Sequence, residues 1–251
     1  MDPLISVVIP SYNNLELFKK ALNSVLDQTY KSVEVIISDD STSDEIEKFC
    51  ASQSDNRIVY THNIPSKGAV KNWNQGLQMA SGDWIIVLHH DEQFGSLDYL
   101  MTLTGEMNTN DILISEVMIE NNGQLRNGKF TGFIKSLILK YPSLFFIINP
   151  IGPCACVAFN KNILQLFDDH LVWRVDMEWY YRIFRCSQKR KYLPYLHVLS
   201  HHGHEDQITN NIDKYSKSKA DIDYLQSKYG YRFLKVFLLF ISKIRKFTGR
   251  S

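Results

Sequence analysis

The sequence predicts an α/β protein with a mainly parallel sheet that is covered by helices on both faces. Short β-branched runs alternate with segments whose apolar residues recur at helical spacing, as in successive strand–helix–strand units. Polar clusters follow several of the runs, and sheets of this class bind ligands beyond the carboxyl ends of their strands. The expected strands cover residues 5–10, 33–38, 57–60 and 83–88, and the expected helices cover residues 15–28, 72–80 and a segment that starts near Glu45.

Local signals support each element of the first half. The first run is β-branched and stops at Pro10, as a short buried strand does. The cluster at 39–44 predicts a helix start, because Asp and Ser side chains cap a first turn and the dipole favours Glu45 and Glu47 there. Gly82 ends the third helix just before the fourth strand. The apolar face of the first helix contains Leu17, Phe18, Ala21, Leu22 and Val25.

The second half is less regular, and residues 130–148 are apolar without a clear period. Residues 211–251 are expected to form a helical, basic, amphipathic tail. Such a tail can lie on an anionic membrane, where each basic residue contributes about 1 kcal/mol; the alternatives are a helix packed on the domain or a dimer contact. The other expected elements are a strand at 112–119, a turn at 121–123, a loop at 149–153, a strand at 154–159 and a helix at 176–186.

Composition excludes several classes of protein. The 251 residues carry a formal net charge of +1, which gives no indication of nucleic acid binding. The first residues lack the basic and apolar regions of a signal peptide, and no apolar run is long enough to span a bilayer. The four cysteines are not spaced like a disulfide framework. We therefore expect a cytoplasmic protein with free thiols.

Two acidic positions follow predicted strands. Asp91 comes just after the fourth strand, where one carboxylate can hold a divalent ion that also binds a diphosphate; the alternative is a solvated loop acid. Asp39 and Asp40 follow the second strand, where they can accept hydrogen bonds from a base or a ribose, cap a helix, or do both.

Four segments in this order carry a family resemblance: Val8–Asn13, Gln28–Tyr30, Glu34–Thr42 and Ala80–Ile85. The chain resembles the large inverting glycosyltransferase family 2 over residues 4–210. The resemblance implies the GT-A fold, a Rossmann-like nucleotide-binding sheet flanked by helices, with a C-terminal helical extension. It also implies one domain at 1–210, with a nucleotide-binding half at 1–95 and an acceptor half at 96–210, followed by the tail at 211–251.

The resemblance assigns the nucleotide site. Asp40 stands where the family contacts the uracil ring, with Asp39 supporting it. His90 stands at a ribose-facing position. Lys67 can reach a phosphate, although a solvated loop lysine is the alternative. The segment that lines the nucleotide pocket corresponds to Pro10, Ser11, Tyr12 and Asn13.

The resemblance assigns the metal to Asp91, with two departures. His89 and His90 replace an acid and a variable residue before it, and Glu92 replaces a common following Asp. Imidazole ligands favour Mn²⁺ over Mg²⁺. His204 matches a late family histidine that can join the metal; His201 and His202 are nearby alternatives, and a plain surface histidine is another.

The same comparison gives the catalytic base. Asp176 matches the family acid that deprotonates the acceptor hydroxyl; the alternative is an acid that only favours its helix N-terminus. The usual Glu before it is Val175, and Glu178 is a weaker candidate. The donor and acceptor subsite is expected to include Gly152, Pro153, Cys154, Trp173 and Glu178.

Together these assignments predict an inverting, metal-assisted transfer from a nucleotide sugar, most simply a UDP-sugar, to a glycan or lipid-linked acceptor in bacterial capsule or O-antigen assembly. The cofactor would be Mn²⁺ or Mg²⁺, and the tail would touch the inner face of the plasma membrane. One alternative is a nucleotidyltransferase, but Pro10–Asn13 is not a glycine-rich, basic phosphate loop. The other is a non-catalytic binding protein, which would not need both Asp91 and Asp176.

Overall fold

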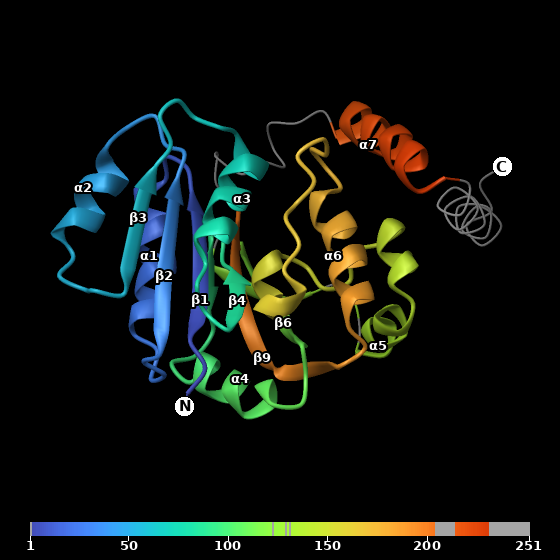
Figure 1. Cartoon of the computed structure of the whole chain (residues 1–251), viewed down its shortest axis with the longest axis horizontal. Helices are drawn as coiled ribbons and strands as arrows, with labels where there is room; N and C mark the ends of the chain where they lie inside the picture. The colour runs from blue at the N-terminus through green and yellow to red at the C-terminus, as the bar shows by residue number, and fades with distance from the viewer. Residues whose placement is uncertain (1, 122, 129, 131, 204–213, 231–251) are drawn as a thin grey trace.

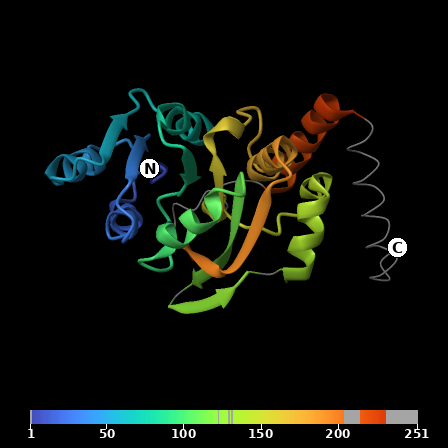
Figure 2. The ribbon, with the colours of Figure 1, turned by 60° about the horizontal axis from the view of Figure 1, so that its bottom comes forward.

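The computed structural model describes residues 2–121, 123–128, 130, 132–203 and 214–230 (Figure 1). Within these residues nine strands form one sheet, in the order β3-β2-β1-β4-β8-β6-β9-β5, with β7 paired to β6. Helices lie on both sides of it: α3 and α6 cover one face, and α1 and α4 the other (Figures 1 and 2). The predicted α/β class is therefore confirmed.

The first half is a parallel sheet, as predicted. Its strands are β1 (Ile5–Ser11), β2 (Val33–Asp39), β3 (Ile58–His62) and β4 (Trp84–Val87). All residues of β1 and β4 are buried, because helices cover both faces and the β-branched side chains fill both layers. In the β1–β2 register Ser11 lies opposite Asp39, so the two strands end side by side.

The second half extends the sheet with strands of both directions. Here β6 and β9 run in the same direction as β1–β4, whereas β5, β7 and β8 run antiparallel to their neighbours. The sheet is mainly parallel for that reason. The bounds are β5 (Glu92–Phe94), β6 (Ile112–Asn121), β7 (Gln124–Asn127), β8 (Val157–Asn160) and β9 (Arg190–His202).

Seven α-helices and three short 3₁₀ helices are present among the described residues. Gly76 lets α3 pack directly on the sheet, because a Cβ at this residue would lie 2.4 Å from Val8 Cγ1. No described helix combines the length and apolarity needed to cross a membrane. The helices are α1 (Leu15–Leu26), α2 (Glu45–Ser52), α3 (Ala69–Met79), α4 (Tyr99–Met107), α5 (Gly132–Lys140), α6 (Val175–Cys186), α7 (Lys214–Tyr229), η1 (Pro142–Phe146), η2 (Cys154–Cys156) and η3 (Lys161–Ile163).

The structure corrects parts of the predicted second half. The strand expected at 154–159 starts only at Val157, since residues 154–156 form a 3₁₀ turn at the site. The long strand β9, the helix α4 and the hairpin strand β7 were not predicted. The tail is helical at 214–229, as expected, whereas the predicted boundary at 210 and the basic end at 231–251 lie outside the described residues.

Candidate active site

The polar segments after β1 and β2 meet at the carboxyl edge of the sheet. The Asp40 backbone N donates to the Ser11 carbonyl at 3.0 Å. Asn13 has a φ of 55°, and its backbone N donates to Ser41 Oγ at 2.8 Å. Tyr12 is exposed at this edge, with 44% of its surface accessible. The structure therefore brings the predicted nucleotide-pocket segment beside the acidic pair, and its contact with a nucleotide stays a prediction.

The two acids of the pair have different partners. Asp39 is fully buried and accepts hydrogen bonds from the Ser41 backbone N at 3.0 Å and from the Tyr60 hydroxyl at 2.8 Å. Asp40 holds the loop that begins α3: it accepts hydrogen bonds from Ser66 Oγ at 2.6 Å, the Lys67 backbone N at 2.7 Å and the Gly68 backbone N at 2.8 Å. Asp40 thus connects the carboxyl edge of the sheet to the loop that begins α3.

The ammonium group of Lys67 lies along α3. Its Nζ donates to Gln75 Oε1 at 2.7 Å, and both groups are exposed. This contact is compatible with the solvated alternative, and the predicted phosphate contact stays untested.

His89 is the most constrained residue of the metal motif. Its backbone N donates to Glu92 Oε2 at 2.9 Å, its Nδ1 lies 3.4 Å from Glu92 Oε1, and its ring packs on Trp73 with centroids 4.6 Å apart. Its Nε2 is buried without a hydrogen-bond partner in the structure. Burial lowers the pKa of His89, but the charges of Glu92, Asp91 and Asp176 and the Glu92 hydrogen bond raise the pKa further, to about 9.

Glu92 is a site residue that the sequence reading noted only as a departure. It is 3% exposed, at the start of β5, and burial raises the pKa of its carboxyl while the positive His89 opposes that shift. Glu92 lies three residues after His89, and no periodic or capping signal marks the pair. The pairing follows from the tight turn at residues 89–92, in which the Glu92 backbone N donates to the His89 carbonyl at 2.9 Å.

The strand β9 places its last residues beside Asp91. The His201 backbone N donates to the Asp91 carbonyl at 2.9 Å, and His201 Nδ1 lies 2.9 Å from Glu120 Oε2. His90 and Asp91 are both partly buried. The predicted metal ligand His204 lies outside the described residues.

Asp176, the predicted base, lies in the first turn of α6 and is partly buried. Cys154 Sγ lies 3.4 Å from Asp176 Oδ1 and donates to it. Desolvation raises the pKa of Asp176 above its ordinary value, and the charge of His89 and the Cys154 hydrogen bond only partly offset this. The charges of Asp91 and Asp176 both raise the pKa of His89, although the two acids lie 85 residues apart in sequence.

The predicted subsite loop lies next to Asp176. Gly152 has a φ of 103°, and a Cβ there would lie 3.0 Å from Val117 Cγ1, so this turn favours glycine. Its carbonyl accepts a hydrogen bond from the Tyr180 hydroxyl at 3.1 Å. Cys154 is fully buried, and burial raises the pKa of its thiol, which therefore stays protonated. Pro153, between Gly152 and Cys154, is partly buried.

Two further subsite predictions concern α6 and the residues before it. Trp173 is partly buried just before the helix, and its backbone N donates to Asp221 Oδ2 at 2.7 Å. The structure does not bring Glu178 into the group around Asp176. The two residues differ by about 200° around the helix, and the Glu178 carboxylate instead pairs, fully buried, with Arg182, Lys228 and Tyr229.

The residues around Asp91 bear on whether a divalent ion fits there. The negative charge of Asp91 acts on the neighbouring His89, whose buried Nε2 has no hydrogen-bond partner among the described residues. Among the described residues, the single set of three possible ligands with atoms within 4.8 Å of one another is Asp168, Asp169 and His170, and Lys228 already binds Asp168. The site therefore fits an ion that takes most ligands from a diphosphate and water, as Mg²⁺ commonly does.

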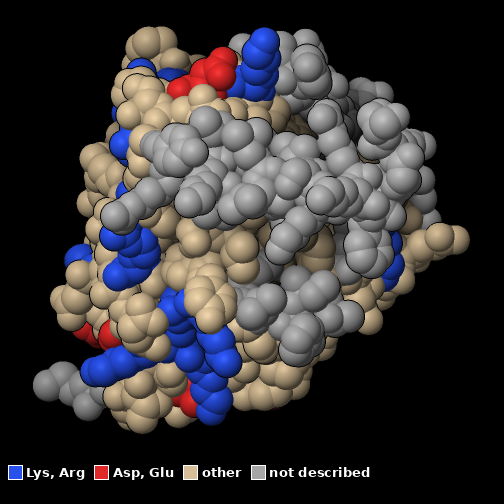
Figure 3. All heavy atoms as spheres, turned by 90° about the vertical axis from the view of Figure 1, so that its right-hand side faces the viewer, with Lys and Arg blue, Asp and Glu red and all other residues tan. Residues whose placement is uncertain are grey.

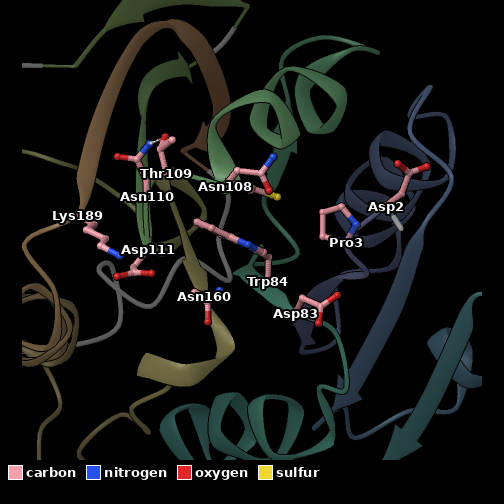
Figure 4. Close-up of a pocket in the computed structure, with 11 residues that line it drawn as sticks. Asp2, Pro3, Asp83, Trp84, Asn108, Thr109, Asn110, Asp111, Asn160 and Lys189 are labelled. Atoms are coloured by element: carbon pink, nitrogen blue, oxygen red, sulfur yellow. Dashed lines mark hydrogen bonds between the residues drawn. The ribbon is translucent and has the colours of Figure 1, made fainter.

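A cavity of about 390 Å³ lies away from this edge, where β1 and β4 begin. Figure 4 shows residues that line it, among them Asp83, Asp111 and Lys189. The site residues predicted from the sequence are not among its lining residues. The candidate site therefore remains at the carboxyl edge.

Comparisons with known proteins identify the family of the chain. The family model described as glycosyl transferase family 2 matches residues 6–176, more than half of the chain. WcaA of Escherichia coli K12, named as a glycosyl transferase of colanic acid biosynthesis, is 27% identical over 266 aligned positions, which cover 100% of this chain and 92% of that protein. The Escherichia coli glucosyltransferase WfgD, named for UDP-Glc and a GlcNAc-diphosphoundecaprenol acceptor, is 32% identical over 177 positions, which cover 70% of this chain and 67% of that protein.

Solved structures share the fold at low identity. S. aureus TarS, in complex with UDP-GlcNAc, superposes with a TM-score of 0.67 at 14% identity, over 91% of this chain and 73% of that one. Two further structures with TM-scores of 0.60 hold Mn²⁺, one with GDP-mannose and one with UDP. The GT-A fold is confirmed.

Proposed function

This chain belongs to glycosyl transferase family 2 and is a glycosyltransferase of bacterial polysaccharide type, and we propose that it transfers a sugar, with inversion, from a UDP-sugar to a hydroxyl of a glycan or lipid-linked acceptor. The printed names of WfgD and TarS, with their uridine diphosphate sugars, support the donor. The diphosphoundecaprenol acceptor of WfgD supports the acceptor class.

One observation carries the proposal. The acid proposed to hold the metal, Asp91, and the acid proposed as base, Asp176, both interact with His89, although they lie on different elements. In the proposed arrangement one acid serves the leaving diphosphate and the other the incoming hydroxyl. A binding protein without turnover would not need both acids.

In the proposed reaction the acceptor hydroxyl transfers its proton to the Asp176 carboxylate. The oxygen then forms a bond to the anomeric carbon from the face opposite the diphosphate, the old C–O bond breaks, and its electron pair leaves with UDP, which gives inversion. Partial burial and a raised pKa make Asp176 a stronger base than an exposed aspartate. The Cys154 thiol orients one carboxylate oxygen and leaves the other available.

The diphosphate side is proposed to use Asp91. A divalent ion held there would neutralise charge that develops on the departing UDP. His89 is oriented by Glu92 and packed on Trp73. Its buried Nε2 has no hydrogen-bond partner within the described part of the chain, and a phosphate oxygen would satisfy it. His90 is proposed to face the ribose, and Pro10–Asn13 with Asp40 to face the base.

We also propose that the protein meets its lipid-linked acceptor at a membrane surface. Figure 3 shows the right-hand side of the molecule, on whose lower part Lys and Arg side chains gather with few acidic ones. Exposed basic residues lie in the last turn of α6 and just after it, namely Arg185, Lys189 and Lys191. Together with the basic residues in the sequence of the tail they would attract an anionic leaflet.

The first experiment measures nucleotide release from uridine, guanosine and thymidine diphosphate sugars, with Mn²⁺, with Mg²⁺ and with chelator. Metal-dependent release from a UDP-sugar is expected. Asp91→Asn should abolish the metal dependence, and Asp176→Asn should lower turnover by about 10²–10⁴-fold. Glu45→Gln, an exposed acid in the first turn of α2, is the matched control and should behave like the native chain.

The reaction product separates the stereochemical alternatives. The anomeric configuration of the transferred sugar, read by NMR, should be opposite to that of the donor. Retained configuration would refute inversion, and absence of both release and calorimetric nucleotide binding by the folded chain would refute transferase activity.

A further inference from the structure

The helix that carries Asp176 does not cap itself. The residue at its N-cap position, Arg174, makes no side-chain capping hydrogen bond. The first N–H groups of an α-helix have no partner within the helix, and a buried helix start needs acceptors from elsewhere. Because Asp176 lies in this first turn, whatever holds the helix start also orients the base.

A carboxylate from α7, beyond the residues that match the family model, holds the residues that lead into α6. The Asp221 carboxylate accepts hydrogen bonds from three successive backbone N–H groups. Those of Trp173 and Arg174 each lie 2.7 Å from Oδ2, and that of Val172 lies 3.2 Å from Oδ1. Asp221 is only 3% exposed. A carboxylate this buried is costly unless it is hydrogen-bonded, and charge-assisted bonds of this kind are stronger than neutral ones.

A second contact lies on the other side of Asp176. The buried Glu178 carboxylate accepts hydrogen bonds from Lys228 Nζ at 2.8 Å and from the Tyr229 hydroxyl, both at the end of α7. The helix α7 therefore contacts the chain on both sides of Asp176: at residues 172–174, just before α6, and at Glu178, within it. The first turn of α6 is fixed between these two contacts.

We propose that Asp221 is a positioning residue for sugar transfer: by holding residues 172–174, which lead into α6, it sets the position of the Asp176 carboxylate relative to the acceptor hydroxyl. The inference rests on the proposed role of Asp176 as base. A displacement of about 1 Å in a reacting group can cost 10²-fold in rate. In this view the C-terminal extension is part of the active site rather than an appendage.

The test compares Asp221→Asn with Asp223→Asn, a matched change at an exposed residue of the same helix. Asp221→Asn keeps the shape but places an amide group against backbone donors, so kcat for nucleotide release should fall about 10–100-fold while KM for the donor stays near native. The acidic limb of the kcat–pH profile should move to higher pH, because a displaced Asp176 loses part of its interactions with His89 and Cys154, which lower its pKa. The groups that face Asp176 itself, His89 and Cys154, are unchanged. Asp223→Asn should leave all three quantities unchanged.

Hydrogen exchange gives a readout that does not depend on turnover. In Asp221→Asn the amides of residues 172–178 should exchange faster than in the native chain, with β1 and β2 unaffected. Asp221→Glu, which keeps the carboxylate, should recover part of the lost kcat and covers the case in which Asp221→Asn does not fold.

The outcomes separate this inference from the proposed function. A native chain that releases nucleotide, together with an Asp221→Asn variant of native kcat and native pH profile, would overturn the positioning role alone. Equal losses of stability and turnover with an unmoved pH profile, or failure of both variants to fold, would assign Asp221 to stability and overturn it too. A native chain inactive on every donor would remove the proposed function and this inference together.

Discussion

Replacing Glu178 by Gln should destabilise the protein without directly removing a catalytic group. The carboxylate is fully buried and binds two cations: Arg182 Nε lies 2.8 Å from Oε1, and Lys228 Nζ lies 2.8 Å from the same oxygen. Removing one partner of a buried ion pair costs about 3–5 kcal/mol, because the remaining charge is left without compensation. The side-chain NH₂ group of Gln would also face the N–H donors of Arg182 and Lys228, which it cannot accept from.

The local contacts place the expected loss at the lower end of this range. Lys228 keeps Asp168, whose Oδ2 lies 2.6 Å from Nζ, and Arg182 keeps the Leu166 carbonyl at 2.6 Å. We therefore expect a loss of about 3 kcal/mol, which lowers Tm by roughly 6–12 °C in a chain of this size. Calorimetry and urea unfolding measure the loss. Because Asp221 still holds residues 172–174 ahead of α6, kcat determined well below Tm should stay within a few-fold of native.

The matched control is Glu106→Gln, which breaks the partly exposed Lys191–Glu106 pair. An exposed pair is worth about 0–1 kcal/mol, so this change should alter Tm little. Equal Tm changes in the two variants would refute the buried-pair reasoning. Native Tm with a large loss of kcat in Glu178→Gln would instead return Glu178 to the substrate subsite.

Two further predictions concern the base and the packing of α3. Because the pKa of Asp176 is raised, kcat should fall with falling pH around a midpoint above that of an ordinary aspartate. Cys154→Ala removes a hydrogen bond that lowers this pKa, so the midpoint of its kcat–pH profile should lie at still higher pH. An unmoved midpoint would contradict the contact. Gly76→Ala should destabilise the protein by about 1–3 kcal/mol in urea unfolding, because its Cβ would overlap Val8. Gly105→Ala, in α4 with open space around it, should instead stabilise by roughly 0.5–1 kcal/mol, and a gain at both glycines would disprove the close approach.

The first half of the fold was predictable because its signals are local. The strands β1–β4 are β-branched runs, the helices between them have periodic apolar faces, and register then brings Ser11 opposite Asp39. The strand β9 was missed for a physical reason: Pro194 and Tyr195 are exposed at an irregularity in its pairing with β6, and they interrupt the alternation that marks a strand. Its pairing partners come from β5 and β6, more than 70 residues earlier.

The site was predictable only in part, for a related reason. Sequence motifs identify residues such as Asp91 and Asp176, whose neighbours along the chain also match a family. They do not identify side chains that act through partners distant in sequence. Asp221 contacts residues 47–49 positions away, and Glu178 contacts residues 50 and 51 positions away. Helical spacing already made Glu178 the weaker candidate, because two residues along a helix turn a side chain to another face, but spacing does not reveal its partners Arg182, Lys228 and Tyr229.

The departure at His89 can be understood from the same geometry. In sequence, histidine in place of an acid lowers the number of carboxylates in the metal motif. In space a carboxylate is still present, since Glu92 is buried against the imidazole. The turn thus holds an oriented histidine and its counter-charge where the family has a single acid. A buried imidazole with a carboxylate on one nitrogen is also how proteins fix the direction of the other nitrogen. The two sequence departures, at positions 89 and 92, are therefore one structural unit.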